Sequence, residues 1–157
     1  MTKADDIHGA IVHPDTGRKD SLIRVAVKAV ILDDEGRTLV VKEDGRDWWD
    51  VPGGGMEHGE TVKEALAREL YEEISLEGDF EYEILIAEDP RLIKTINMYQ
   101  MRITFLVKPS SMSFKPGIDG DEIQFVDADT YETSDLWTER QICMLSQLAK
   151  KRKSASL

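Results

Sequence analysis

The sequence predicts one α+β domain in which helices pack on a mixed β-sheet. Its 157 residues suit a single domain, and 41% of them are apolar, which is typical of a globular chain. The chain reads as strands, a helix, further strands and a final helix. One apolar set recurs at period two, as a buried sheet face requires: Tyr99, Met101, Ile103, Phe105 and Val107.

The first elements are expected to form a β-hairpin. Two β-rich runs, residues 25–32 and 38–42, flank a turn-like segment of aspartate, glutamate and glycine at residues 33–36. A short strand is predicted through the sequence DWWDV, residues 47–51.

A helix is expected to begin at Thr61. Thr61 and Glu64 have the spacing of a capping box, in which each side chain binds the backbone of the other residue. An apolar stripe follows at helical spacing, which predicts one face buried against the sheet: Val62, Leu66, Leu70 and Ile74.

The second half of the chain predicts three more strands and a helix. The strands are residues 80–88, residues 96–108 and a run that begins near Glu122. The helix is residues 138–151, with Thr138 and Gln141 spaced as a second capping box. We therefore expect an N-terminal extension over residues 1–20, one domain over residues 21–150 and a basic tail over residues 151–157.

The net charge of the chain and the length of its apolar runs argue against two classes of protein, binders of duplex nucleic acid and membrane proteins. The net charge of −11 opposes binding to the phosphate backbone of duplex nucleic acid. No run reaches the roughly 18 apolar residues that a membrane span needs, and the first ten residues lack the apolar core of a signal peptide. We therefore expect a cytoplasmic protein without a membrane partner. The single cysteine, Cys143, excludes an internal disulfide.

Three glutamates of the first helix indicate a metal site. On a helical wheel Glu69, Glu72 and Glu73 lie along the border of the apolar stripe. Like charges at this spacing cost roughly 0.2 to 0.5 kcal/mol per pair, so a positive partner is expected. Mg²⁺ prefers such oxygen ligands, and the glycines Gly53, Gly54 and Gly55 just before the helix permit a tight turn and close approach to a ligand. A solvated acidic face is the alternative interpretation.

The segment from Gly54 to Leu76 resembles the Nudix box, the signature of enzymes that hydrolyse a nucleoside diphosphate linked to another moiety. One position departs from the pattern, because Ser75 stands where the family has glycine. Eight residues match at the family's spacing: Gly54, Glu60, Arg68, Glu69, Leu70, Glu72, Glu73 and Leu76. The resemblance covers about residues 21–150 and implies an α/β/α sandwich and a pyrophosphohydrolase.

The resemblance also implies roles for these residues. Glu69, Glu72 and Glu73 would bind Mg²⁺, or Mn²⁺ as the alternative, and take part in catalysis. The Gly54 carbonyl would join the metal shell, as would Glu57. Arg68 would orient Glu72, Glu60 would brace the loop, and Gly53, Gly54 and Gly55 would approach the bound nucleotide.

Several points stay open at this stage. The general base belongs either to the helix or to a later loop with three candidates, Asp119, Asp121 and Glu122, of which we use Glu122 as the working candidate. The substrate is a small nucleotide, either an ADP-ribose-like molecule or a nucleoside triphosphate. A homodimer is compatible with the sequence. The alternative functions are a non-catalytic nucleotide-binding regulator and a plain cation-binding scaffold. At Ser75, either serine adopts a left-handed conformation or the helix ends elsewhere, near Gly78.

Overall fold

The computed structural model describes residues 10–155. Within this range the strands are β1 (Ala10–Val12), β2 (Lys19–Ser21), β3 (Arg24–Val30), β4 (Thr38–Glu43), β5 (Gly53–Gly55), β6 (Phe80–Ala87), β7 (Arg91–Ile93), β8 (Met98–Pro109) and β9 (Gly120–Val126). The helices are α1 (Val62–Ile74), the 3₁₀ helix η2 (Ala128–Tyr131) and α2 (Trp137–Ala155).

A mixed sheet forms the centre of the fold. Its strand order is β5-β3-β8-β6, with β7 paired to part of β8. Strands β3 and β8 are parallel, whereas β5 pairs antiparallel to β3 and β6 antiparallel to β8. Strands β4 and β9 form a separate antiparallel pair. The expected α+β architecture with a mixed sheet is confirmed.

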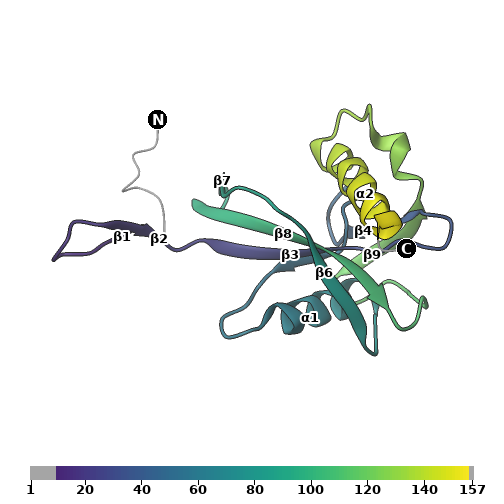
Figure 1. The fold of residues 1–157 in the computed structure, drawn as a ribbon, viewed down its shortest axis with the longest axis horizontal. Coiled ribbons are helices and arrows are strands. Elements are labelled where there is room, and N and C mark those ends of the chain that lie inside the picture. The colour runs from purple at the N-terminus through teal and green to yellow at the C-terminus, as the bar shows by residue number, and fades with distance from the viewer. Residues whose placement is uncertain (1–9, 156–157) are drawn as a thin grey trace.

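The two helices cover opposite faces of the strands, as Figure 1 shows. Helix α1 packs on one core, whose buried members include Val27 and Ala29 of β3. Helix α2 packs on a second core, which includes Val30 and Leu106. Alternation along β3 and β8 sends neighbouring residues into different cores. The predicted buried face of β8 is confirmed for Phe105 and Val107, but Leu106 is buried too, because the middle of the sheet is covered on both sides.

The predicted first hairpin is wrong in its pairing. The chain does reverse at residues 33–37, where the Asp33 carboxylate accepts hydrogen bonds from the backbone of Glu35 and Arg37. Only one bridge, between Leu32 and Thr38, joins the two arms. Beyond this bridge β3 pairs with β8 in the central sheet, and β4 pairs with β9. Each of these two pairings is longer than the single bridge between the arms of the turn.

The short strand expected through residues 47–51 is also wrong. Asp50 makes one isolated bridge with Val41, and the strand in this region is β5, which is the triple glycine itself. The glycines therefore form an edge strand instead of the predicted tight turn, and Gly54 lies opposite Val27 in the antiparallel ladder.

Local hydrogen bonds set both ends of helix α1. Thr61 and Glu64 form the predicted capping box, which confirms the start of the helix. At the other end Ser75 has φ 53° and ψ 34°, a left-handed conformation. The backbone N–H of Ser75 donates to the Tyr71 carbonyl, which is the αL capping motif that glycine usually completes, and the Leu76 N–H donates to the Leu70 carbonyl. Ser75 therefore adopts the conformation that its position demands.

Helix α2 starts one residue before the predicted capping box, so the assignment of that box to Thr138 and Gln141 is wrong. Ser134 acts at this end instead, because its Oγ accepts from the backbone N–H of Leu136 and donates to Glu139. The helix continues to Ala155, and Arg152 and Lys153 lie in its last turn, near the negative pole of the helix dipole.

Strands β1 and β2 form a hairpin that projects away from the sheet and its helices (Figure 1). It falls in the predicted N-terminal extension. Among residues 10–155, neither α1 nor α2 is apolar enough over sufficient length to cross a membrane.

Replacement of Ser75 by glycine is predicted to stabilise the protein by about 1 kcal/mol, because glycine adopts the left-handed conformation without a Cβ clash. Urea denaturation of both proteins measures the change. Ser113→Gly is the matched control, since Ser113 has no positive φ, and this change should not stabilise. Equal unfolding free energies for Ser75→Gly and the native protein would contradict the assigned strain.

Candidate active site

The outer edge of strand β5 is bound by charged side chains instead of by another strand. The Gly53 N–H donates to Glu73 Oε2 over 3.0 Å, and the Gly53 carbonyl accepts from Lys28 Nζ over 2.9 Å. The Gly55 carbonyl accepts from Arg68 Nη2 over 3.0 Å. An exposed strand edge carries unpaired backbone groups, and here three charged residues satisfy them.

The triple glycine leaves room for other groups, which lie against each of its Cα atoms. A Cβ at Gly54 would lie 2.7 Å from Glu69 Oε1. A Cβ at Gly53 would collide with the backbone of Val27, and one at Gly55 with the Arg24 guanidinium. Gly53 also has φ 130°, a conformation that residues with a side chain rarely adopt. The glycines thus let a carboxylate and a guanidinium sit directly on the strand.

Arg68 connects helix α1 to the segment that precedes it. Its Nε donates to Glu60 over 2.6 Å, and its Nη1 donates to Glu69 over 2.8 Å and to Glu72 over 3.3 Å. The Arg68 guanidinium lowers the pKa of Glu60 to about 2, since it stabilises the ionised carboxylate. These contacts raise the pKa of Arg68. The expected pairing of Arg68 with Glu72 and the bracing contact of Glu60 are both present.

Glu73 is almost completely buried, with 3% of its surface exposed. Burial raises its pKa to about 8, because desolvation disfavours the charged form. The nearby Lys28 ammonium and the Gly53 N–H oppose this shift. Burial also raises the pKa of Glu72, which Arg68 counteracts. The two carboxylates therefore lie in a region from which water is partly excluded.

Lys28 is a buried cation on the central strand β3, with 5% of its surface exposed. Its Nζ lies 3.2 Å from Asp50 Oδ2 and donates to the Gly53 carbonyl. A buried charge needs such partners, because desolvation without them costs several kcal/mol. Lys28 therefore links the segment before β5 to the glycine strand and lies close to Glu73.

A later loop docks on the C-terminal end of α1. Backbone N–H groups of Lys115, Gly117 and Asp119 donate to carbonyls in the last turn of the helix. Glycine is required at Gly117 and at Gly120, where a Cβ would collide with those carbonyls. This docking satisfies helix groups that have no intrahelical partner. It also places Asp119, one of the loop candidates for the general base, beside Glu72.

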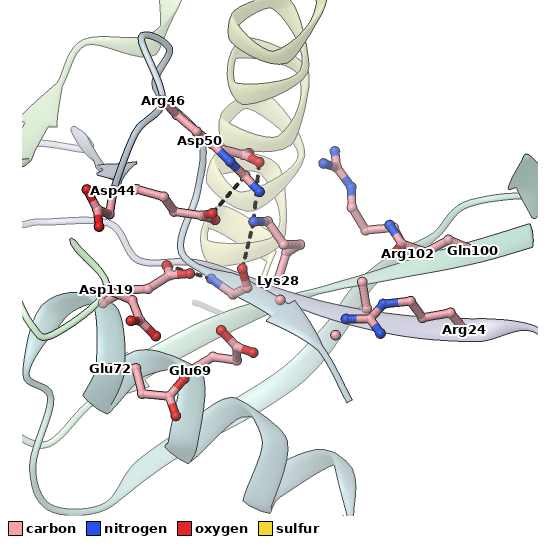
Figure 2. Close-up of a pocket in the computed structure, with 16 residues that line it drawn as sticks. Arg24, Lys28, Asp44, Arg46, Asp50, Glu69, Glu72, Gln100, Arg102 and Asp119 are labelled. Atoms are coloured by element: carbon pink, nitrogen blue, oxygen red, sulfur yellow. Dashed lines mark hydrogen bonds and ion pairs between the residues drawn. The ribbon is translucent and has the colours of Figure 1, made fainter. Parts of the chain in front are cut away.

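These groups surround a cavity of about 490 Å³ with two chemically different sides. Figure 2 shows Asp44 and Asp119 on one side, Glu69 and Glu72 below, and Arg24, Gln100 and Arg102 on the other side. The lining residues are Arg24, Ala26, Lys28, Glu43, Asp44, Arg46, Asp50, Gly53, Gly54, Gly55, Glu69, Glu72, Glu73, Gln100, Arg102 and Asp119.

Several predicted site residues lie outside the cavity lining, among them Glu57, Arg68 and Glu122. Glu122 is on β9, where its carboxylate is 3.7 Å from Lys42. Glu57 is exposed and reaches only to 4.0 Å from Arg68 Nε. Strand alternation separates Glu122 from Asp119, and the loop before α1 turns the Glu57 side chain to solvent.

The cationic part of the cavity was not predicted from the sequence. Lys28 interrupts an otherwise apolar strand, VAVKAV, and a charge at such a position is itself a signal. Gln100 and Arg102 alternate with the predicted apolar face of β8, so they had to lie on its opposite face. The acids Glu43, Asp44 and Asp50 carried no motif, and only the fold brings them to the cavity.

The donor set fits a hard divalent cation. Glu69, Glu72 and Glu73 all line one cavity next to Gly54, and they offer carboxylate oxygens, the ligands that Mg²⁺ prefers. Among residues 10–155, no three acidic, histidine or cysteine side chains converge closely enough to hold a metal ion as they stand. Arg68 holds Glu69 and Glu72, and the Gly53 N–H holds Glu73, so the carboxylates must turn from these partners to ligate.

In the metal-free protein, Glu73 is predicted to make the free energy of unfolding decrease as the pH rises. Its pKa is about 8 when folded against an ordinary value of 4.5, so between these pH values the unfolded chain loses this proton and the folded chain keeps it. The free energy of unfolding should fall by about 1.4 kcal/mol per pH unit from this group. Glu73→Gln should remove that fall, measured by denaturation from pH 5 to 8 in EDTA. Glu57→Gln is the control, and equal slopes for Glu73→Gln and the native protein would refute the shift.

Arg68→Met is predicted to destabilise the protein by about 2 to 3 kcal/mol, because three carboxylates and the Gly55 carbonyl lose their shared donor. The midpoint of urea denaturation measures this loss. Lys63 lies on the same helix as Arg68 and makes an exposed ion pair with Asp79. Lys63→Met breaks this pair and should cost less than about 1 kcal/mol. Similar losses in the two variants would show that Arg68 is an ordinary surface residue.

Known proteins share this fold and part of this sequence. The RNA pyrophosphohydrolase of Ruthia magnifica subsp. Calyptogena magnifica is 38% identical over 71 residues, which make up 45% of this chain and 38% of that protein. The chain thus spans less than half the length of this curated relative. A MutT protein from Methanosarcina mazei Go1 superposes with a TM-score of 0.65 at 19% identity, covering 83% of this chain and 96% of that one.

A second similar structure contains a nucleotide and a metal. It is a bifunctional NMN adenylyltransferase/ADP ribose pyrophosphatase from Francisella tularensis complexed with AMP and a Mn ion. The TM-score is 0.52 at 19% identity, over 78% of this chain and 37% of that one. At these identities the two structures show a common fold. The family model of the NUDIX domain matches residues 22–146, and the chain therefore belongs to the Nudix family.

Proposed function

We propose that this protein is a divalent-metal-dependent hydrolase that cleaves a pyrophosphate linkage in a nucleoside diphosphate derivative. The observation that carries this proposal is that Glu69, Glu72 and Glu73 all line one cavity beside the glycine strand. A protein with a net charge of −11 also needs a cation to hold an anionic substrate at such a site.

Glu69, Glu72 and Glu73 would hold the cation, with Mg²⁺ the preferred ion and Mn²⁺ the alternative. A bound ion would polarise the phosphoryl oxygens and neutralise the negative charge that develops during hydrolysis. Arg68 orients Glu69 and Glu72 through one shared Nη1. The Gly53 N–H holds Glu73, and all three carboxylates would turn from these donors to bind the ion.

The hydrolytic step requires a proton acceptor. The water oxygen forms a bond to one phosphorus, the bond from that phosphorus to the bridging oxygen breaks, and the water gives up a proton. We assign this proton to Asp119, which lines the cavity beside Glu72, in place of Glu122, which lies outside it. The backbone hydrogen bond from Asp119 to the Glu72 carbonyl holds this carboxylate close to the end of α1.

The names of similar proteins supply two candidate substrate classes, RNA and ADP-ribose. Both contain a nucleotide with a phosphate linkage. A non-catalytic nucleotide-binding regulator remains the second candidate function, but the three carboxylates that line the cavity favour the enzyme, because a hydrolase of this kind uses them to hold a cation.

Glu69→Gln and Glu73→Gln are predicted to lower metal-dependent turnover by at least about 100-fold, since each removes a charged ligand while keeping the side-chain shape. The measurement is phosphate-containing product from ATP and ADP-ribose with Mg²⁺ and with EDTA. Glu57→Gln, outside the cavity, should retain activity and serves as the control. Tight nucleotide binding without any turnover in the native protein would select the regulator instead.

A further inference from the structure

The side of the cavity opposite Asp44 and Asp119 is cationic, and the metal-binding carboxylates do not account for it. Arg24 of β3 and Arg102 of β8 extend into the cavity from this side (Figure 2). The parallel register places Arg24 beside Gln100 and Ala26 beside Arg102, so these residues form one patch on a single sheet face. The small side chain of Ala26 leaves room between the two guanidinium groups.

Arg24 differs from the other cations of the cavity in having no acidic partner. Lys28 is paired with Asp50, and Arg46 is paired with Glu43. Among residues 10–155, Arg24 makes no hydrogen bond or ion pair with another side chain. Its guanidinium packs instead on the Cα of Gly55, and that glycine is required for the contact. A guanidinium seated in this way has its donors available for a ligand.

Arg102 is held in place from two directions. Its Nε donates to Glu88 over 2.6 Å, and its Cζ lies 5.6 Å from the Trp137 ring centroid. Its Nη2 is buried and has no partner among the described residues, although a buried donor without an acceptor is destabilising. The guanidinium therefore retains hydrogen-bonding capacity for an acceptor brought into the cavity.

The two ends of the cavity are adjacent along strand β5. Glu69 packs on Gly54, whereas Arg24 packs on Gly55, the next residue. Successive residues of a strand face opposite sides, so Glu69 and Arg24 reach β5 from its two faces, and both line the cavity. A phosphate chain that lies along the free edge of β5 can therefore contact both groups.

We propose that Arg24, Gln100 and Arg102 form a subsite for a third phosphate, so that the preferred substrates are nucleotides with a triphosphate. In an ADP-ribose-like molecule the corresponding group is a neutral sugar, which cannot offset the charge of Arg24 and Arg102. Arginine binds phosphate through paired, charge-assisted hydrogen bonds. This inference rests on the proposed function, because it assigns the pyrophosphate to the carboxylate end of the cavity.

The test compares ATP with ADP-ribose in the presence of Mg²⁺. Arg24→Met should lower kcat/KM for ATP by about 10- to 100-fold and that for ADP-ribose by less than about 3-fold. Arg102→Lys, which keeps the charge but loses the paired donors, should show the same selectivity with a smaller loss. Arg18→Met removes the same charge at the projecting hairpin and should leave both values unchanged. Equal losses for the two substrates, or no loss for ATP, would overturn the proposal.

A binding measurement separates this proposal from the proposed function. Calorimetry in EDTA with inorganic tripolyphosphate and pyrophosphate reports on the arginine subsite without metal or turnover. The native protein should bind tripolyphosphate at least about 10-fold more tightly than pyrophosphate, and Arg24→Met should remove that difference. If the native protein hydrolyses neither nucleotide, the proposed function fails while this result still decides the subsite. Equal binding of the two anions by the native protein would overturn it.

Discussion

The site depends on one physical constraint, the close approach of charged groups to a strand without side chains. Strand β5 pairs with β3 along one edge, and its other edge binds Glu73, Lys28 and Arg68. Any Cβ on this strand would displace a neighbouring group. The glycines therefore leave room for the charged side chains that bind the backbone groups of this edge. They also let a carboxylate of α1 lie directly against the strand.

This arrangement concentrates negative charge in a protein that is already acidic. Arg68 and Lys28 offset part of it, since each bridges a carboxylate and a backbone carbonyl of β5. At Glu73 the desolvation caused by burial outweighs the nearby Lys28 ammonium and still raises the pKa to about 8. Buried charged groups of this kind often stabilise a protein less than apolar residues of the same size would. A cation that binds only the folded protein would increase its stability.

The end of helix α1 couples the carboxylates to a distant part of the chain. The left-handed Ser75 closes the helix, and the loop at residues 115–119 then binds its last carbonyls. Because this loop also carries Asp119, the geometry that satisfies the helix end brings an additional acid to the cavity. The hydrogen bonds that satisfy the end of the helix therefore also fix the position of Asp119 at the cavity.

The sequence alone determined the local features: the capping box at Thr61, the apolar stripe of α1, the glutamates on its border and the alternation along β8. These depend on the period of a helix or a strand and on neighbours within a few residues, so spacing reveals them. Only the tertiary structure decided that β4 leaves β3 for β9, that the triple glycine is an edge strand, and that Arg24 and Arg102 face the carboxylates. Each of those outcomes depends on contacts between segments far apart in the chain, where competing ladders and buried charges are settled by the whole fold.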